Sequence, residues 1–152
     1  MTRKFALVVW MAFMIAGTTQ AQQAIDWQTL ADVKWVPTYF AEYDDYYNMP
    51  EFGKKVKGLD GKEVSLKGFY VPVDPSGSMF ALSAYPSSMC FFCNGAGLES
   101  VAEIVPRKGE TGLKRIAADK YIEIKGRLTL NKSEADHLMY ILKETELVRV
   151  IK

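Results

Sequence analysis

Two cysteines separated by two residues form the one segment of this chain whose residue types and spacing indicate chemistry. They are Cys90 and Cys93, in the stretch Met-Cys-Phe-Phe-Cys-Asn-Gly-Ala-Gly. Thiols at this spacing can close a small disulfide ring, and they can also present two thiolates to one metal ion. A third interpretation is that both are small buried side chains beside Phe91 and Phe92. The sequence leaves these three interpretations open.

The metal interpretation requires further ligands, because zinc takes four and the chain has no second cysteine pair. The candidate additional ligands are Glu99, Asp74 and His137, and a second protomer is another source of thiolates. His137 is the only histidine, and we expect it on the polar side of a short helix, which favours a solvated side chain over a ligand. Met89 next to Cys90 is a weak indication of copper in place of zinc.

Several catalytic classes lack the residues that they need. Haem attachment requires a histidine directly after Cys93, where this chain has Asn94. A thioredoxin-like site requires the cysteines at the start of a helix, and Gly95 and Gly97 are poor helix openers. With one histidine expected in solvent, a serine or cysteine hydrolase has no good candidate base. We therefore favour a role without catalysis over carboxylate acid–base chemistry, and we assign no catalytic residue.

Composition and charge are those of an ordinary globular protein. Of 152 residues, 49% are hydrophobic, and 19 Lys and Arg nearly balance 18 Asp and Glu. The length favours one compact domain. Because the formal net charge is only +1, the chain offers no electrostatic reason to expect a nucleic-acid partner.

The first 21 residues have the pattern of a secretory signal peptide. Arg3 and Lys4 precede twelve unbroken apolar residues, 5–16, and Ala21 is a small residue at the expected cleavage site. Twelve residues span about 18 Å as a helix, which is short for a membrane core of about 30 Å. We therefore expect a periplasmic or secreted protein with no stable membrane insertion after cleavage. Its 17 basic and 18 acidic residues give a net charge of about −1, and its cysteines meet oxidising conditions.

The elements expected around the cysteines are short strands. Residues 54–57 lead to an Asp60-Gly61 hairpin turn, and the strands that follow cover residues 63–73, 79–85, 121–130 and 146–151. Residues 99–105 are a further candidate strand, with a short helix that starts after Gly97 as the alternative. Gly68 and Gly126 interrupt two of these strands and indicate points of curvature. The spacing of Ala135, Leu138, Met139 and Leu142 predicts a short helix over residues 134–143. The fold class is therefore mainly β: a small, curved antiparallel OB-like barrel with a short helix before the last strand.

Residues 22–52 are expected to form an N-terminal arm that precedes the barrel domain of residues 53–152. Asp26 can cap a short helix that carries Trp27 and Leu30, and the segment 39–47 interleaves five aromatic residues with three carboxylates. We expect these rings to pack onto the barrel with the acids in solvent. The alternative is an aromatic platform that binds a sugar or a peptide.

Three blocks of the chain together carry a resemblance to a known group of proteins. They cover residues 59–64, 67–69 and 71–74; residues 82–83, 90–93 and 97–100; and residues 124–131 and 140–142. The chain resembles, over nearly all of its length after residue 21, a group of small exported bacterial proteins of unknown function related to OB-like domains. The resemblance implies an envelope location and the curved barrel, and it supplies no catalytic role.

Two hypotheses for function follow from these observations. In the first, an exported envelope protein uses the Cys90–Cys93 loop to bind a metal ion or to form a redox-sensitive disulfide. In the second, the protein is an interaction module without catalysis, and the barrel face or the aromatic arm binds an envelope protein or a glycan.

Overall fold

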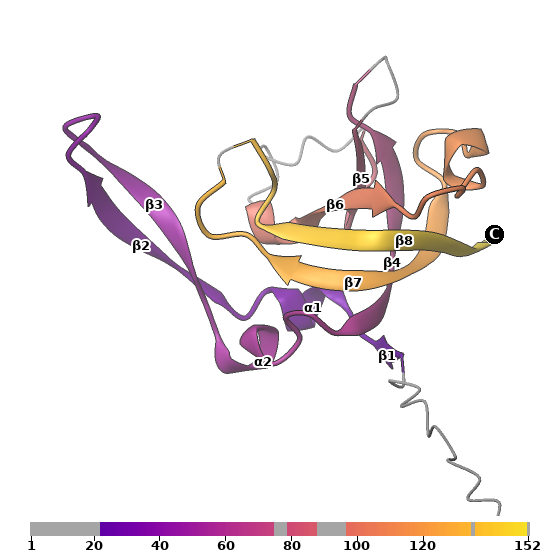
Figure 1. Ribbon diagram of the computed structural model, residues 1–152, viewed down its shortest axis with the longest axis horizontal. Coiled ribbons are helices and arrows are strands. Elements are labelled where there is room, and N and C mark those ends of the chain that lie inside the picture. Colours follow the sequence, from indigo (N-terminus) through magenta and orange to yellow (C-terminus); the bar gives the residue numbers. More distant parts are fainter. Residues whose placement is uncertain (1–21, 75–78, 88–96, 135, 152) are drawn as a thin grey trace, which may run out of the picture.

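The computed structural model describes residues 22–74, 79–87, 97–134 and 136–151 (Figure 1). Within these ranges no helix is both long and apolar enough to cross a membrane. The first half holds β1 (Gln23–Ala24), α1 (Trp27–Leu30), β2 (Val33–Phe40), β3 (Asp45–Phe52), α2 (Lys54–Lys57) and β4 (Glu63–Pro72). The second half holds β5 (Phe80–Ser83), the 3₁₀ turn η1 (Leu98–Ser100), β6 (Val101–Pro106), the 3₁₀ turn η2 (Leu113–Arg115), β7 (Tyr121–Leu130) and β8 (Tyr140–Val150).

Five strands close into a barrel, which confirms the predicted fold class. The strands follow one another around the barrel in the order β4, β5, β6, β8 and β7, and β7 returns to pair with β4. The last strand therefore lies between the third and the fourth, as the strands of an OB-like barrel can do. The pairing of β6 with β8 is parallel, whereas the other four pairings that close the barrel are antiparallel. The barrel is thus not wholly antiparallel, because β8 runs in the same direction as β6.

The interior of the barrel is filled by alternate residues of its strands. The alternation of apolar and polar positions on β7 predicts one buried face of Ile122, Ile124, Leu128 and Leu130; the first three are buried and Leu130 is partly buried. Leu30 of α1 and Val56 of α2 are also fully buried in this core. The two short helices therefore belong to the barrel's hydrophobic core; in Figure 1 they lie beside each other below β7.

Two glycines occupy places where the backbones of the barrel come close together. A Cβ atom added at Gly68 would lie 2.6 Å from the carbonyl oxygen of Ser83, and one added at Gly126 would lie 2.9 Å from that of Lys143. The pairing of β7 with β8 shifts register between Lys125 and Arg127, so Gly126 marks an irregularity of the kind expected. β4 pairs with β7 from Glu63 to Phe69 and with β5 from Phe69 to Pro72, so Gly68 directly precedes the residue at which one partner strand replaces the other.

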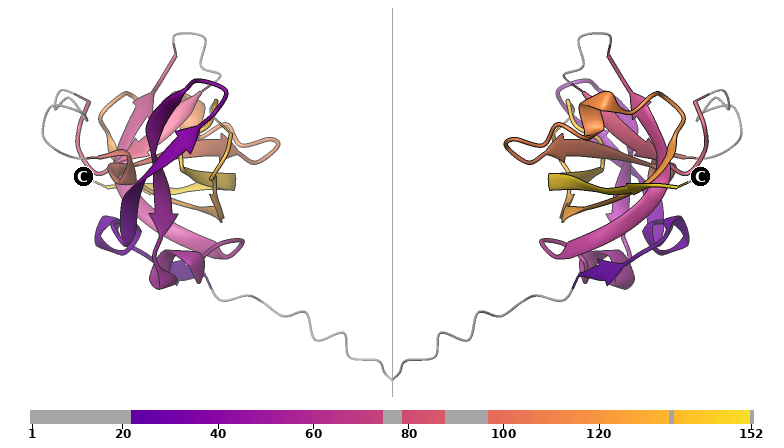
Figure 2. Two further views of the ribbon diagram at one scale, coloured as in Figure 1. Left: turned by 90° about the vertical axis from the view of Figure 1, so that its left-hand side faces the viewer. Right: turned by 90° about the vertical axis from the view of Figure 1, so that its right-hand side faces the viewer.

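The β2–β3 hairpin stands apart from the barrel. Its two eight-residue strands pair from Val33–Phe52 to Phe40–Asp45, and in the described part of the chain they form a two-stranded sheet of their own. Figure 1 shows the hairpin extending away from the barrel, and the left panel of Figure 2 shows it from its outer side. The prediction that the rings of residues 39–47 pack onto the barrel is therefore wrong, since Tyr43 and Tyr46 are 62% and 67% exposed.

Residues 54–57 form the helix α2 and not a strand. The segment begins after Gly53, whose backbone is extended, and it turns because burying Val56 and Leu59 on one side requires helical spacing. The Asp60-Gly61 pair still makes a turn, with Gly61 at a φ of 74°, but this turn joins a helix to β4. The predicted hairpin at this position is consequently absent.

The helix predicted over residues 134–143 is not formed. Residues 131–134 and 136–139 make turns and bends, and β8 already begins at Tyr140. The side chain of Asn131 competes with helix formation, because its amide nitrogen donates to the carbonyls of Glu134 and His137, at 2.7 and 3.1 Å. Its side-chain oxygen accepts from the backbone nitrogen of Glu134 at 2.9 Å. The loop 131–139 is therefore closed around one asparagine.

Candidate functional site

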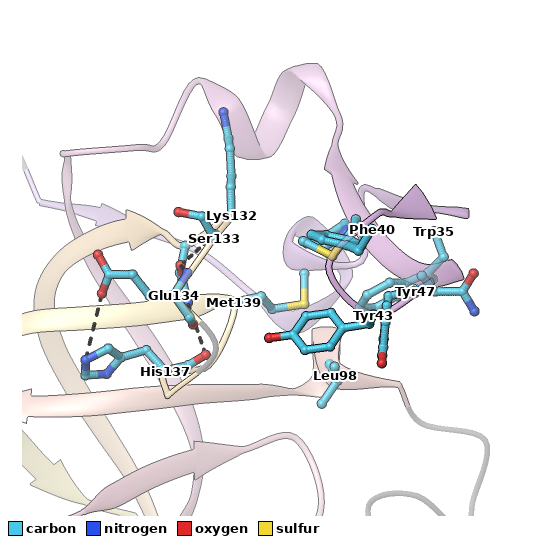
Figure 3. Close-up of a pocket in the computed structure, with 14 residues that line it drawn as sticks. Trp35, Phe40, Tyr43, Tyr47, Leu98, Lys132, Ser133, Glu134, His137 and Met139 are labelled. Atoms are coloured by element: carbon cyan, nitrogen blue, oxygen red, sulfur yellow. Dashed lines mark hydrogen bonds and ion pairs between the residues drawn. The ribbon is translucent and has the colours of Figure 1, made fainter. Parts of the chain in front are cut away.

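A cleft of about 550 Å³ lies between the β2–β3 hairpin and the barrel. Its lining is mostly apolar, and its volume is in the range of sites that hold organic ligands. Figure 3 shows aromatic side chains on the hairpin side and the loop 131–139 on the barrel side. The lining residues are Trp35, Phe40, Tyr43, Tyr47, Asn48, Met49, Pro50, Leu98, Asn131, Lys132, Ser133, Glu134, His137 and Met139.

The hairpin wall is built from rings in edge-to-face contact. The ring of Tyr47 lies 5.7 Å from that of Phe40 and 5.9 Å from that of Tyr43, at steep interplanar angles. This arrangement is favourable for aromatic pairs. Tyr39 and Tyr46, paired across the strands, lie 5.3 Å apart and do not line the cleft. The hairpin therefore has one ring cluster in the cleft and a second cluster, Tyr39 and Tyr46, outside it.

At the tip of the hairpin, a hydrogen bond holds the second cluster. The hydroxyl of Tyr39 donates to Oδ1 of Asp44 at 2.7 Å, and this bond raises the pKa of the Tyr39 phenol. Asp44 has a φ of 50°, in the left-handed region that aspartate tolerates better than most residues. The turn between β2 and β3 is thus fixed by its own side chains.

The barrel wall is anchored by a pair formed between a buried carboxylate and the single histidine. Glu103 on β6 is 5% exposed, and its Oε1 and Oε2 accept from Nδ1 of His137 at 2.9 and 3.0 Å. The backbone nitrogen of Leu138 also donates to Oε2 of Glu103, at 3.1 Å. Because a buried carboxylate requires such partners, these bonds tie the loop 131–139 to the barrel.

The same pair sets the protonation of His137. The hydrogen bond that the imidazole makes to Glu103, together with the negative charge of that carboxylate, raises the pKa of the imidazole. Glu134 and Asp136 add smaller contributions. Nε2 of His137 lies 3.9 Å from Oε2 of Glu134. Both ring nitrogens therefore face carboxylates, and among the described residues no hydroxyl or thiol is hydrogen-bonded to this imidazole. The pair is suited to hold a loop and not to activate a nucleophile.

The predicted site residues lie in different parts of the structure. Cys90 and Cys93 lie outside the described residues, so the disulfide and metal hypotheses stay predictions. Oδ1 of Asp74 accepts from the backbone nitrogen of Met79 at 2.8 Å, beyond the end of β4. Oε2 of Glu99 is buried and lacks a hydrogen-bond partner in the described part of the chain. His137 is engaged by Glu103, as above.

These residues form no metal centre within the described ranges. In the part of the chain that the structure describes, no three His, Cys, Asp or Glu residues are grouped so that they could hold a metal ion. Whether zinc or copper binds at Cys90 and Cys93 therefore stays a prediction about residues 88–96.

Glu103 and the cleft itself are not predicted from the sequence. Glu103 follows Val101 and Ala102 and precedes Ile104 in a strand, and an acid within an apolar strand is the available signal of a buried carboxylate. Its pairing with His137 joins residues 34 positions apart, so no local pattern could show it. The aromatic segment 39–47, named from the sequence as an alternative binding platform, supplies rings of the hairpin wall of the cleft. The barrel loop opposite was not named.

Comparison with known proteins assigns this chain to no family. No family model matches the chain, and no curated protein does. Among solved structures, the crystal structure of a DUF3299 family protein from Pseudomonas aeruginosa PAO1 aligns with a TM-score of 0.46 and 14% identity, over 86% of this chain and 95% of that one. The small barrel fits a generic OB-like domain. No residue role is transferred from this similarity.

Proposed function

We propose that this protein is an exported binding module, without catalysis, that holds an extended segment of an envelope protein in the cleft between the hairpin and the barrel. The observation that carries the proposal is the cleft, which joins the half-buried ring of Phe40 and the exposed rings of Tyr43 and Tyr47 to a barrel loop. A contiguous set of exposed aromatic side chains is unusual on a protein surface that binds nothing. The export rests on the signal-peptide pattern of residues 1–21.

The structure of the barrel wall supports binding more than catalysis. The loop 131–139 is closed by Asn131 and tied to β6 through Glu103, so that its residues are held in place before any ligand arrives. Preorganisation of this kind lowers the entropy cost of binding. The rings on the opposite wall offer large contact areas with few rotatable bonds.

Site-specific photocrosslinking in the cell tests this proposal. A benzophenone amino acid replaces Met49, which lines the cleft, or Tyr46, which lies on the hairpin but does not line it. We expect a discrete protein adduct from position 49 that is lost when Tyr47→Ala is added, and no such adduct from position 46. Equal adducts at both positions, or a glycan adduct at position 49, would contradict the proposal.

For the Cys90–Cys93 loop, we propose either a redox-sensitive disulfide or a metal site. A natively purified protein that is lighter by two hydrogens and regains them with reductant contains the disulfide. A chelator-sensitive metal at one equivalent per chain, or per two chains, identifies a metal site. Free thiols without metal would exclude both.

A further inference from the structure

We infer that the segment held in the cleft is basic: an extended peptide whose lysine or arginine side chains lie against the rings and carboxylates of the hairpin. This inference rests on the proposed function and names the chemistry of the partner. It is carried by the rings and the charge of the hairpin, which forms one wall of the cleft.

The hairpin carries aromatic side chains along its strands and carboxylates at its tip. Residues 35–50 contain six aromatic side chains and three carboxylates, and neither lysine nor arginine. The carboxylates are Glu42, Asp44 and Asp45 at the tip. Ring faces carry partial negative charge and attract ammonium and guanidinium groups. Rings and carboxylates together therefore favour a cation over an anion or a neutral group.

One of these carboxylates lies on the side of the hairpin that carries rings of the cleft. Asp45 pairs with Phe40 in the register of the hairpin, and paired residues of antiparallel strands project from the same side of the sheet. Glu134 lines the opposite wall, but its carboxylate lies 3.9 Å from Nε2 of His137. A cation against this side of the hairpin would thus meet rings and the carboxylate of Asp45.

The two basic side chains of the cleft do not offset this charge at the rings. Figure 3 shows Lys132 extending away from the aromatic cluster. His137 directs Nδ1 to the carboxylate of Glu103, so its charge is balanced within the barrel wall. Neither of these two basic groups is therefore directed at the rings of the cleft.

The extent of the surface favours a peptide over a small cation. Each hairpin strand has eight residues, about 26 Å of extended chain. Exposed apolar and aromatic side chains follow this length from Val36 to Tyr43 at the tip. A single small cation would leave most of this surface uncovered.

Titration calorimetry of the mature chain with three matched peptides tests the inference. The probes are an octapeptide of alternating lysine and threonine, the same peptide with every lysine acetylated, and one with glutamate in place of lysine. We expect the lysine peptide to bind most tightly and to weaken with added salt. Tyr47→Ala should weaken it about tenfold, since it removes a ring face, whereas Tyr46→Ala should not.

Charge variants separate electrostatic attraction from simple apolar contact. Asp45→Asn should weaken binding of the lysine peptide about two- to fivefold, and Asp136→Asn, outside the cleft lining, should leave it unchanged. Equal affinity for the lysine and acetyl-lysine peptides, with Tyr47→Ala still harmful, would overturn the inference and leave the proposed function standing. Binding of none of the peptides, or preference for glutamate, would also overturn it. The crosslinking experiment then decides the proposed function separately.

Discussion

The β2–β3 hairpin and the barrel are both built mainly from antiparallel strands, but they place their aromatic side chains in opposite environments. In the barrel, Tyr70, Phe80 and Tyr140 are at most 5% exposed. In the hairpin, Tyr39 and Tyr47 are exposed by almost half, and the tip residues by more. The barrel encloses a core, whereas the hairpin has solvent on most of its surface. The same residue types therefore stabilise the fold in one region and are available for binding in the other.

The side chains that stabilise the fold and those that are available for binding therefore lie in different segments of the chain. Burial of a large apolar side chain contributes about 1.5–3 kcal/mol to folding, whereas a half-exposed ring contributes much less. Substitutions in the barrel should consequently change the free energy of unfolding, and substitutions in the hairpin should change binding. Substitutions in the two regions test this separation.

The largest effect is expected from a cavity in the barrel core. Ile124 on β7 is fully buried between its neighbours Leu66 on β4 and Leu147 on β8. Ile124→Ala should lower the free energy of unfolding by about 2–5 kcal/mol, because it removes buried methyl groups and leaves a cavity. Urea denaturation followed by circular dichroism measures this loss. A loss below about 1 kcal/mol would show that the barrel interior is loosely packed.

A smaller loss is expected where the barrel backbones approach each other. Gly68→Ala would place a Cβ 2.6 Å from the carbonyl oxygen of Ser83 and 2.8 Å from Cγ of Leu82. The strands must separate to admit it, at a cost of about 1–3 kcal/mol. Gly58→Ala is the matched control, since its Cβ would meet only carbonyl oxygens at 3.4 Å and its φ of −68° suits alanine. Thermal denaturation of the two variants should separate them clearly.

The barrel and the hairpin also differ in how far the sequence could predict them. The bounds of β7, residues 121–130, were predicted to the residue, because alternation of apolar and polar side chains is the direct consequence of one buried face. The hairpin lacks such alternation because neither of its faces is buried. The spacing that predicted a helix is that of Leu138, Met139 and Leu142. The apolar run Tyr140–Leu142 belongs to a buried strand, and a short apolar run does not distinguish a strand from a helix.

The candidate site was less predictable than the fold for a related reason. Its cleft joins a hairpin near the start of the chain to a loop near the end, and only the closed barrel brings these segments together. The Glu103–His137 pair likewise depends on the position of β8 beside β6. Local patterns identify the aromatic segment 39–47, but contacts between distant segments require the fold.

A pH titration tests the link between the barrel and its loop. Because Glu103 raises the pKa of His137 above its ordinary value of 6.5, protonation stabilises the folded state. This stabilisation is fully present below pH 6.5 and is lost as the pH rises through the raised folded-state pKa. The effect should be smaller than that of the core substitutions, since the imidazole is 44% exposed.

Nuclear magnetic resonance can follow this titration directly, because His137 is the only histidine of the chain. Its imidazole should titrate above 6.5 in the native protein and should return toward 6.5 in Glu103→Gln. His137→Gln should remove the corresponding decline in unfolding free energy with rising pH. An imidazole that titrates at or below 6.5 in the native protein would show that the pair does not hold the loop.

The smallest effect on stability is expected in the hairpin, and it is the most direct test of the comparison. Tyr46→Ala and Tyr47→Ala should each change the free energy of unfolding by less than about 0.5 kcal/mol, because the first residue is 67% exposed and the second 46%. Yet only Tyr47 lines the cleft, so only its removal should weaken binding of the lysine peptide. A loss of 2 kcal/mol or more in Tyr47→Ala would mean that the hairpin folds as one unit with the barrel. The exposed rings would then serve stability, and their place beside the cleft would no longer be a sufficient argument for binding.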